Sequence, residues 1–390
     1  MWHSCSALGE ACRRTVLTRS SPQFMSELPP QAGRAVAVIL AAGKSTRMKS
    51  RLPKAVHPIC GKPMAWHVVA ACRRAGVSDV VVVVGHQGQS VVDALGPTVA
   101  YAEQRQQLGT GHALMCAAPI LPPDAGLLLV LPADTPLISH TELATLMQFH
   151  REQNSHATLL TAILDDPSHY GRVVRAPDGS VTRIVEAKDA DADALAIREI
   201  NSSIYCFAAE EALRALRHVK PNNAQGEYYL TDVIELLGKS GGRVHAVPSS
   251  DPTAVLGINH RAELAKVEAL MRSRILRGLM LAGVTVTDPS STYVDADVSV
   301  GADAVLRPGT HLLGATTVGE ECTIGPCTVI SNSTVGAGAS VELSRVADST
   351  IGEGASVGPY ACVLNGSRVE SGAVVGPFRQ LDGAIVGPNA

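Results

Sequence analysis

This chain of 390 residues has few aromatic residues, no long apolar run and a small net charge. Phe, Trp and Tyr make up 3% of it, so its cores must be built from aliphatic side chains, and the hydrophobic fraction of 46% is sufficient for that. No apolar run approaches the roughly 20 residues of a membrane-spanning helix. The formal net charge of −3 gives no electrostatic reason to expect a nucleic acid partner. Neither a membrane nor a nucleic acid is therefore expected as a partner.

Paired cysteines are also missing. The nine cysteines are scattered, with no C-x-x-C motif and no Cys/His spacing typical of zinc sites. Scattered cysteines are typical of free thiols in a reducing compartment. We therefore expect a cytoplasmic protein without a structural zinc site.

The first 33 residues differ from the rest. They contain few acids, several serines, and Arg13, Arg14 and Arg19, but no apolar core of a secretory signal. Residues 1–33 are predicted to form a disordered extension. A transit peptide is one alternative, and a start at Met25, close to the first strand, is another.

Residues 34–257 show apolar runs alternating with helical patterns. Ala35–Leu40, Val80–Val84 and Leu127–Leu131 are typical of strands buried on both faces of a parallel sheet. Pro63–Arg74 predicts a helix that Gly76 ends. This alternation predicts an α/β domain with helices on both faces of a parallel sheet, whose ligands bind at the carboxyl ends of the strands.

Residues 258–286 are predicted to form a helical connector. Its apolar residues recur at three- and four-residue steps within Asn259–Gly283, which indicates one apolar stripe. Arg272, Arg274 and Arg277 lie on other faces and are expected to be solvated. The stripe comprises Leu264, Val267, Met271, Ile275, Leu279 and Ala282.

Residues 287–390 have a period of six. Aliphatic residues recur every sixth position from Val294 to Ile330, and the period continues to Val386 with one-residue phase slips, the first before Val335. Glycine often follows the aliphatic residue, as at Gly301. A sustained hexapeptide repeat predicts a parallel β-helix in which each repeat forms one side of a triangular coil.

The stretch Ala35–Lys54 has the sequence AVAVILAAGKSTRMKSRLPK. A buried strand is followed by a turn of small residues, which lets backbone N–H groups approach a ligand, and then by the cations Lys44, Arg47 and Lys54. Such an arrangement favours phosphate binding. It matches neither the Walker A spacing nor the Rossmann fingerprint.

These residues resemble the signature of sugar-1-phosphate nucleotidyltransferases, which is approximately LAAGxGTRM, a short gap and PK. Ser45 is the one departure, because the family usually has glycine there, and a positive φ would cost serine energy that glycine avoids. An ordinary strand–turn–helix is the alternative interpretation of this stretch.

Further matches make the resemblance more specific. A nucleotidyltransferase domain joined by a helix to a left-handed β-helix resembles the bacterial N-acetylglucosamine-1-phosphate uridylyltransferases, in which the β-helix usually carries glucosamine-1-phosphate acetyltransferase activity. The resemblance covers roughly residues 34–390 and implies a homotrimer packed coil against coil. The matching segments are QLGTGHA (107–113), YGRVVR (170–175), IVEAKDA (184–190), EINSSIY (199–205), NNAQGEYYLTDVI (222–234) and GIN (257–259).

The resemblance implies attack of a sugar 1-phosphate on the α-phosphorus of UTP, with release of pyrophosphate. Such chemistry depends on positioning and charge neutralisation, which Mg²⁺ can supply with one or two protein oxygens. Asp134 and Asn259 match the family's metal ligands. The alternatives are a turn cap before Pro136 for Asp134 and an N-cap of the connector helix for Asn259. Ala133 stands where the family has glycine, and its methyl group can crowd the nucleotide.

The remaining site residues also follow from the resemblance. Arg47, whose guanidinium matches phosphate oxygens, Lys54 and Asp134 are expected to be catalytic; a solvated surface charge is the alternative for either cation. Gly171, Glu186, Asn201 and Asn259 are expected to bind the sugar phosphate substrate. The expected nucleotide-binding residues are Leu40, Ala41, Ala42, Gly43, Lys54, Gln104, Gly109 and Thr110.

The second activity of the family is not expected here. Its acetyltransferase half needs two arginines where this chain has Cys362 and Leu364, and lysines one coil later, where it has Asp382 and Gly383. No histidine follows His311, and the sequence ends before the family's catalytic histidine. The β-helix is therefore expected to be an oligomerisation stem.

Two other functions remain open at this point. The chain can be a nucleotidyltransferase for another sugar 1-phosphate, such as glucose 1-phosphate. It can also be a non-catalytic scaffold that binds a nucleotide sugar, although intact Arg47, Lys54, Asp134 and Asn259 argue against this.

Overall fold

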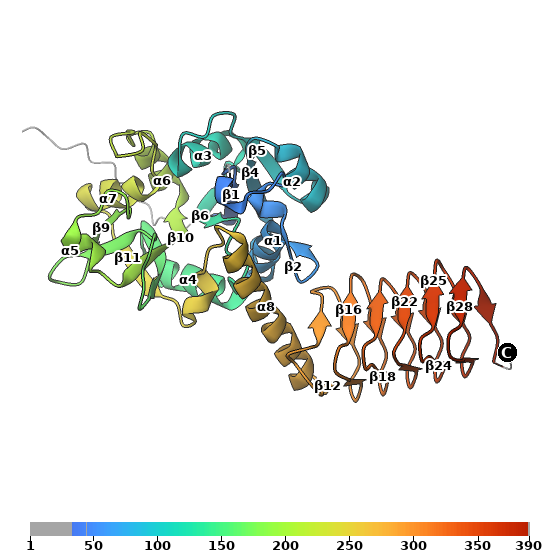
Figure 1. Cartoon of the computed structure of the whole chain (residues 1–390). Coiled ribbons are helices and arrows are strands. Elements are labelled where there is room, and N and C mark those ends of the chain that lie inside the picture. Colours follow the sequence, from blue (N-terminus) through green and yellow to red (C-terminus); the bar gives the residue numbers. More distant parts are fainter. Residues whose placement is uncertain (1–32, 44, 389–390) are drawn as a thin grey trace, which may run out of the picture.

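The computed structural model describes residues 33–43 and 45–388. The extension predicted for residues 1–33 lies, apart from Gly33, outside the described residues. Along the described chain, an α/β unit is followed by a long helix and then by a slender β-helix that extends away from the α/β unit (Figure 1). No helix in the described part combines the length and the apolar character needed to cross a membrane. The predicted fold class, an α/β unit followed by a left-handed β-helix, is confirmed.

The α/β unit is built on a nine-stranded sheet whose main path runs β11-β7-β10-β6-β1-β4-β5. Each of the three predicted strands is present and slightly longer than its apolar run, as β1 (Arg34–Ala41), β4 (Asp79–Val84) and β6 (Ala125–Pro132). The other strands are β5 (Ala100–Glu103), β7 (Ala157–Ile163), β8 (Arg172–Arg175), β9 (Val181–Val185), β10 (Glu199–Ala208) and β11 (Val244–Pro248).

The expectation of a parallel sheet is wrong for β10 and for the pair β8–β9. Strands β1, β4, β5 and β6 are parallel, but β10 runs antiparallel to both β6 and β7. The chain reaches β10 through the antiparallel pair β8–β9 and not through a crossover helix, so β10 enters the sheet from the opposite end.

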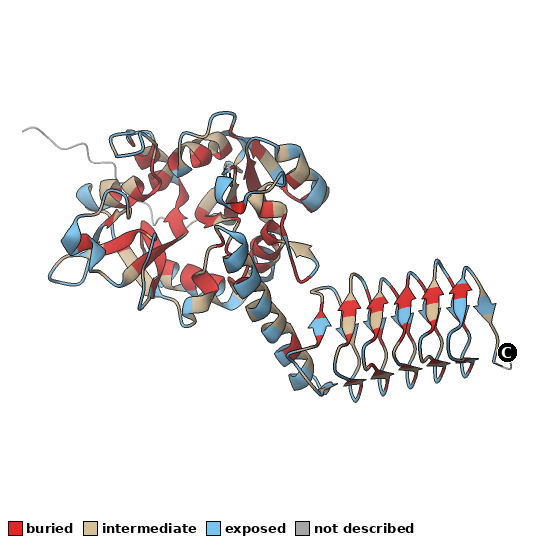
Figure 2. Cartoon of the chain, viewed as in Figure 1, coloured by how far each residue is buried: buried red, intermediate tan, exposed pale blue. Residues whose placement is uncertain are grey.

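Helices cover both faces of the sheet, and the buried residues lie between them and the strands (Figure 2). On one face pack α1 (Met64–Arg74), α2 (Gly88–Leu95) and α4 (His140–Glu152), and on the other α3 (Thr110–Ala117), α6 (Ala209–Leu216) and α7 (Thr231–Lys239). A short helix, α5 (Ala192–Leu195), precedes β10. The predicted end of α1 is confirmed, because the helix stops at Arg74 and Gly76 takes a φ of 90°.

The connector helix α8 (Arg261–Leu281) begins with a capping box, in which His260 accepts a hydrogen bond from the Glu263 N–H and the Glu263 carboxylate bonds back. Most of the predicted stripe packs against neighbouring residues. Ala282 does not belong to it, because it follows the helix and is exposed. The prediction that Arg274 is solvated is wrong, because its guanidinium donates hydrogen bonds to the Leu137 carbonyl and the Asp251 carboxylate.

The β-helix consists of three six-stranded parallel sheets, one for each side of the coil. The first contains β12 (Thr285–Val286), β15 (Val305–Leu306), β18 (Thr323–Ile324), β21 (Ser340–Val341), β24 (Ser356–Val357) and β27 (Val374–Val375). The second contains β13 (Tyr293–Val294), β16 (His311–Leu313), β19 (Val329–Ser331), β22 (Arg345–Ala347), β25 (Cys362–Leu364) and β28 (Gln380–Asp382). The third contains β14 (Ser299–Val300), β17 (Thr317–Val318), β20 (Thr334–Val335), β23 (Thr350–Ile351), β26 (Arg368–Val369) and β29 (Ile385–Val386).

The phase slips of the repeat are absorbed at the corners of the coil. Val305 pairs with Thr323, but Thr323 pairs with Ser340 and Ser340 with Ser356, so successive coils are shorter by one residue while the strands stay in register. The corner glycines allow this close stacking, because a Cβ on Gly301 would lie 2.5 Å from the Glu320 nitrogen of the next coil.

Candidate active site

Most of the residues predicted to bind nucleotide or metal or to be catalytic follow the carboxyl ends of β1, β5 and β6. Strand β1 lies between β4 and β6 in the sheet. The loop after β1 leads toward β4 on one side of it, whereas β6 is added later on its other side. The loops after β1 and β6 therefore diverge, and a crevice forms between such loops at the carboxyl ends of the strands. At their start the two loops are in contact, because the Ala133 N–H after β6 donates to the Leu40 carbonyl of β1 at 3.1 Å.

A cavity of about 570 Å³ opens at this point. It brings together the residues predicted for nucleotide, metal and catalysis. The buried Ala133 is among its walls, as are residues that were not predicted, such as Gln107, Ser203 and Glu227. Its lining comprises Leu40, Ala41, Ala42, Gly43, Ser45, Arg47, Lys54, Ala55, Gln104, Gln107, Gly109, Thr110, Ala113, Pro132, Ala133, Asp134, Ser203, Glu227 and Asn259.

Another groove, of about 700 Å³, lies between α7, β9 and β11. It is larger, but none of the predicted site residues lines it. We place the candidate active site in the smaller cavity because the cations and the carboxylate that phosphate chemistry requires converge there.

The loop after β1 contains a residue in the left-handed region. Ser45 has a φ of 54°, which is the conformation that glycine adopts without cost. Its hydroxyl is held at both sides, since it donates to the Gly43 carbonyl at 3.2 Å and accepts from the Lys54 N–H at 3.1 Å. The serine side chain therefore connects Gly43 and Lys54, the two ends of the segment after β1 that we call the phosphate loop, by hydrogen bonds that glycine cannot make.

Two cations sit against two oxygen donors in the cavity. The Lys54 ammonium forms an ion pair with the Asp134 carboxylate, and the Arg47 guanidinium donates to Asn259 Oδ1 at 2.7 Å. A carboxylate and an amide oxygen are hard donors of the kind that Mg²⁺ takes, with water and phosphate oxygens completing its shell. The donor set therefore fits a divalent cation that binds together with a triphosphate.

Asn259 is brought to Asp134 by the segment that precedes α8. The Ile258 N–H donates to the Asp134 carbonyl at 3.1 Å, and a Cβ on Gly257 would lie 3.9 Å from Asp134 Oδ2. The alternative role of Asn259 as N-cap is wrong, because His260 caps the helix. The amide side chain is consequently available to the cavity.

Three of the expected nucleotide-binding residues, Gln104, Gly109 and Thr110, lie between the end of β5 and the start of α3. Gln104 is 3% exposed, and its amide nitrogen contacts the Gly109 carbonyl and His112 Nδ1, both at 3.0 Å. Gly109 has a φ of 107°, and a Cβ there would lie 2.6 Å from the Tyr228 carbonyl oxygen. Thr110 Oγ1 accepts from the Leu230 N–H at 3.0 Å. These bonds fix the rim of the cavity before any ligand binds.

Of the four residues matched to the sugar phosphate, Asn259 lines the cavity and the other three form a second group outside it. Gly171 directly precedes β8, Glu186 directly follows β9, and Asn201 lies on β10. A Cβ on Gly171 would lie 3.4 Å from Glu186 Oε2, and the Asn201 N–H donates to the Gly171 carbonyl at 2.8 Å. The Asn201 amide donates to the Tyr205 hydroxyl at 2.8 Å and accepts from the Ser203 N–H at 3.1 Å. Burial, followed by the charges of Asp189 and Asp232, raises the pKa of Glu186.

Sequence reasoning missed several residues of the site. Gln107 and Glu227 belong to segments that matched the family but were not singled out, and both line the cavity. Ser203 also lines it, two positions after Asn201. His169 contacts Asn259 across 90 positions of sequence. No spacing in the sequence signals that last contact, because only the fold joins the two segments.

Comparison with known proteins yields two family models and a set of close relatives. Residues 37–226 match the MobA-like NTP transferase domain, and residues 297–332 match the bacterial transferase hexapeptide (six repeats). A protein of Brevibacillus brevis named "Bifunctional protein GlmU" is 48% identical over 351 residues, which cover 90% of this chain and 76% of that protein. Proteins of the same name from Exiguobacterium sibiricum and a Geobacillus strain are 47% and 44% identical over 90% of this chain, and 78% and 76% of their own lengths are covered.

Proposed function

The chain belongs to the GlmU family, and we propose that it makes UDP-N-acetylglucosamine and pyrophosphate from UTP and N-acetylglucosamine 1-phosphate in a Mg²⁺-dependent reaction. One observation carries the proposal: Arg47, Lys54, Asp134 and Asn259 converge in one cavity beside a loop of small residues. The same convergence argues against a non-catalytic scaffold, which has no need of paired cations and metal-type oxygens.

The reaction joins a phosphate oxygen of the sugar to the α-phosphorus of UTP while the bond to pyrophosphate breaks. Little covalent work falls to the protein, which must align the two phosphates and neutralise their charge. Arg47 and Lys54 suit this role, because each is long enough to exchange its present oxygen partner for phosphate oxygens. Arg47 would hold the departing pyrophosphate with its planar fork, and Lys54 would act as a point charge beside the reacting phosphates.

Asp134 and Asn259 would hold the Mg²⁺ ion. When bound, the ion would supply positive charge that stabilises the charge of the transition state. The ion pair of Asp134 with Lys54 keeps a carboxylate in the cavity without an unpaired negative charge.

Residues at the edge of the cavity and in the second group around β8 to β10 would determine which two substrates bind. The Gln104 amide nitrogen is already hydrogen-bonded within the protein, so the Gln104 amide oxygen is the atom that can accept a hydrogen bond from the imide N–H of uracil. Glu186, Asn201 and the backbone N–H of Gly171 would contact the sugar. These contacts would distinguish one sugar from another by hydrogen bonds. Activity measurements with other sugar 1-phosphates therefore test directly whether the chain prefers a different sugar.

A pyrophosphate-release assay over a grid of nucleoside triphosphates and sugar 1-phosphates tests the proposal. We expect UTP with N-acetylglucosamine 1-phosphate to have the highest kcat/KM, and chelation of divalent cations to abolish the signal. A higher kcat/KM with glucose 1-phosphate would identify the alternative substrate, and no release with any pair would support the scaffold.

We also propose that this chain does not transfer acetyl groups. Cys362 and Leu364 occupy β25, and Asp382 and Gly383 lie on the next coil, where Leu364 pairs with Asp382. A thiol, an aliphatic side chain and a carboxylate cannot clamp a sugar phosphate as cations do. Thiol release from acetyl-CoA with glucosamine 1-phosphate should stay at the uncatalysed background, and turnover that disappears on removing the β-helix would disprove this.

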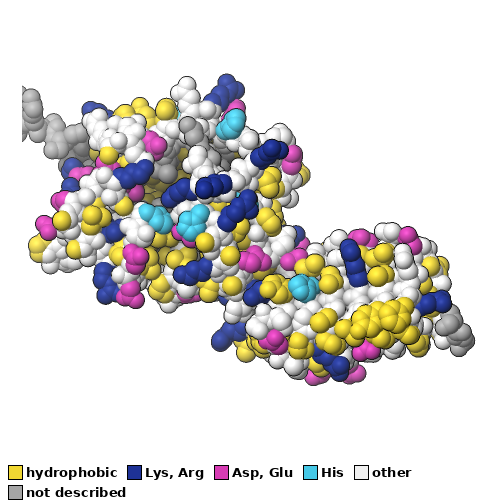
Figure 3. Space-filling view, in the orientation of Figure 1, with side chains coloured by type: hydrophobic (Ala, Val, Ile, Leu, Met, Phe, Trp, Pro, Cys, Tyr) yellow, Lys and Arg dark blue, Asp and Glu magenta, His cyan; other side chains and the backbone are white. Residues whose placement is uncertain are grey.

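The β-helix is proposed to assemble the protein as a homotrimer. Its outer surface carries hydrophobic side chains gathered along the coils (Figure 3). Two of its exposed aromatic side chains, Tyr360 and Phe378, are 55% and 78% exposed and stack with 5.2 Å between the ring centroids. Exposed apolar ridges of this kind mark surfaces that associate with other protein.

A further inference from the structure

The loop between β7 and β8 places a histidine against the amide of Asn259. His169 Nε2 lies 2.8 Å from Asn259 Nδ2, while the Arg47 guanidinium lies 2.7 Å from Asn259 Oδ1 on the other side of the same amide. The amide is thus gripped from two sides by groups that come from different loops.

The chemistry of these two groups decides how the amide is turned. A guanidinium only donates hydrogen bonds, so the atom that faces Arg47 must be the amide oxygen. The NH₂ group then faces His169 and donates to it, so Nε2 must be the unprotonated nitrogen of the ring. The ring proton is on Nδ1, which lies 3.4 Å from Ser168 Oγ. His169 and Arg47 together therefore permit only one orientation of the amide.

The ring of His169 is itself held in place. It stacks on Tyr170 with 4.8 Å between the ring centroids, and the Tyr170 hydroxyl accepts from the Gly257 N–H at 3.0 Å. Beneath the loop, the guanidinium of Arg172, which is 3% exposed, donates to the carbonyls of Ser168 and Tyr170. The loop is thus fastened both to the segment that carries Asn259 and to β8.

We propose that His169 is a positioning residue for the metal site, which fixes the Asn259 amide with its oxygen toward Arg47 in the cavity that Asp134 also lines. This inference rests on the proposed function, in which Asn259 holds a divalent cation. A ligand that is already turned correctly does not lose rotational freedom when the cation binds, and second partners of metal ligands act in this way. Arg47 alone is insufficient, because it leaves the amide when it turns to phosphate.

Two variants separate the hydrogen bond from the packing. His169→Phe keeps a ring to stack on Tyr170 but cannot accept a hydrogen bond, whereas His169→Gln offers an amide oxygen as acceptor. Mn²⁺ affinity of the full chain, measured by electron paramagnetic resonance in the presence of a non-hydrolysable UTP analogue, is the readout. We expect His169→Phe to weaken Mn²⁺ binding about 10-fold and His169→Gln to restore most of it.

The outcomes are distinct. Unchanged Mn²⁺ affinity in His169→Phe overturns the inference, and so does an equal loss in His169→Gln, which would indicate a packing role. Asn259→Ala, titrated in the same way, tests the proposed metal site separately. If Asn259→Ala weakens Mn²⁺ binding and His169→Phe does not, only the inference about His169 fails. If Asn259→Ala has no effect, the assignment of the metal ligand fails first.

Circular dichroism verifies that each variant is folded. If His169→Phe is not folded, the Mn²⁺ affinity of His169→Gln decides the outcome. Wild-type affinity in His169→Gln supports the inference, and a 10-fold loss overturns it.

Discussion

Ser45 shows how one residue of the phosphate loop balances strain against bonding. Its left-handed backbone costs a non-glycine residue about 1–2 kcal/mol, and the two hydrogen bonds of its hydroxyl are each worth about 0.5–1.5 kcal/mol. Because these terms are of similar size, serine can replace the glycine usual at this position without loss of the loop.

Two substitutions of Ser45 should therefore differ. Ser45→Gly relieves the strain and loses both hydrogen bonds, so the free energy of unfolding should change by less than about 1 kcal/mol. Ser45→Ala keeps the strain and loses the bonds, and should be less stable by about 1–3 kcal/mol. Urea denaturation of the wild type and both variants measures the differences. Wild-type stability in Ser45→Ala would show that the hydroxyl bonds are unimportant, and equal stability of the two variants would show that the left-handed backbone is not strained.

The second prediction at this scale concerns the metal ligands. Asp134→Asn and Asn259→Ala should each lower uridylyl transfer at least about 100-fold. The first removes the negative charge and the second the amide oxygen that would hold the Mg²⁺ ion. The fold should be retained, since both side chains face a cavity. Asp303→Asn, an exposed carboxylate on the β-helix, is the matched control. Full activity in either site variant at unchanged Mg²⁺ dependence would remove the proposed metal site.

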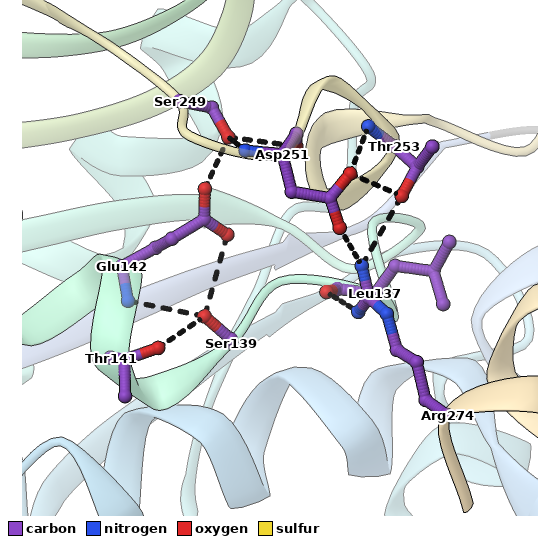
Figure 4. A network of polar contacts seen from close by, with 8 residues as sticks. All are labelled: Leu137, Ser139, Thr141, Glu142, Ser249, Asp251, Thr253 and Arg274. Carbon is purple, nitrogen blue, oxygen red and sulfur yellow. Dashed lines mark hydrogen bonds and ion pairs between the residues drawn. The ribbon is translucent and has the colours of Figure 1, made fainter. Parts of the chain in front are cut away.

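At the scale of elements, α8 is part of the active site as well as a connector. Its residue Val267 packs in a small core with Met48, which follows Arg47, and with Ile258, which precedes Asn259. Further along the helix, Arg274 bonds to the Leu137 carbonyl and at 2.6 Å to Asp251, next to the hydroxyl-rich network of α4 (Figure 4). The helix thus holds both sides of the cavity at a fixed separation.

Removing the Arg274 contacts should loosen this docking. Burial by itself would raise the pKa of Asp251, but hydrogen bonds from Thr253 and the charge of Arg274 lower it below its ordinary value of 3.8. The ion pair therefore stabilises the fold above about pH 4 and is lost at more acid pH. Arg274→Met should cost about 1 kcal/mol, since the pair is partly exposed, whereas exposed Arg277→Met on the same helix should cost nothing measurable. Thermal unfolding at pH 7 tests this, and equal melting temperatures would contradict it.

A buried histidine on helix α4 should make the free energy of unfolding depend on pH in a second way. His150 is fully buried beside Thr158 Oγ1 at 2.9 Å, and burial, with the charges of His156, Arg151 and His245, lowers its pKa from 6.5 to about 4. Between these values the unfolded chain binds a proton at this ring and the folded chain does not, so stability falls as the pH falls from about 6.5 to about 4.

Removing this titration should flatten the stability profile. His150→Gln keeps a polar partner for Thr158 but cannot be protonated, so up to about 3 kcal/mol of acid destabilisation should disappear. Urea denaturation at several pH values measures the slope, with exposed His86→Gln as control. An unchanged slope in His150→Gln would show that other groups cause the acid sensitivity.

At the scale of the whole molecule, the β-helix is docked on the α/β unit and not merely tethered to it. The Ala296 N–H of the first coil donates to the Cys60 carbonyl at 2.9 Å, between β2 (Pro58–Ile59) and β3 (Lys62–Pro63), and Lys62 forms an ion pair with Asp297. A trimer built on the β-helix would therefore hold three active sites in defined positions.

Truncation tests the proposed assembly. The full chain should scatter light as three copies of 40.7 kDa, whereas a chain without residues 285–390 should remain soluble, be less oligomeric and retain uridylyl transfer. Retention is expected because α8 and the cavity lie outside the removed segment. A monomeric full-length protein would disprove the trimer.

Much of this organisation could be predicted because it depends on local patterns. Apolar runs determine buried strands, a six-residue period determines a β-helix, and the loop motif after β1 identifies the enzyme class, which the GlmU relatives confirm. The residues predicted for nucleotide and metal also meet in one cavity, because the loops after parallel strands open at the same edge of a sheet.

Tertiary structure alone decided the rest, because it depends on contacts between distant segments. The antiparallel direction of β10 follows from how the chain returns to the sheet, and the docking of Arg274 on Leu137 joins residues 137 positions apart. The orientation of the Asn259 amide depends on Arg47 and His169, which lie 212 and 90 positions away. The sequence does not show which of these distant residues are partners, because no local spacing or periodicity joins them and only the fold brings them together.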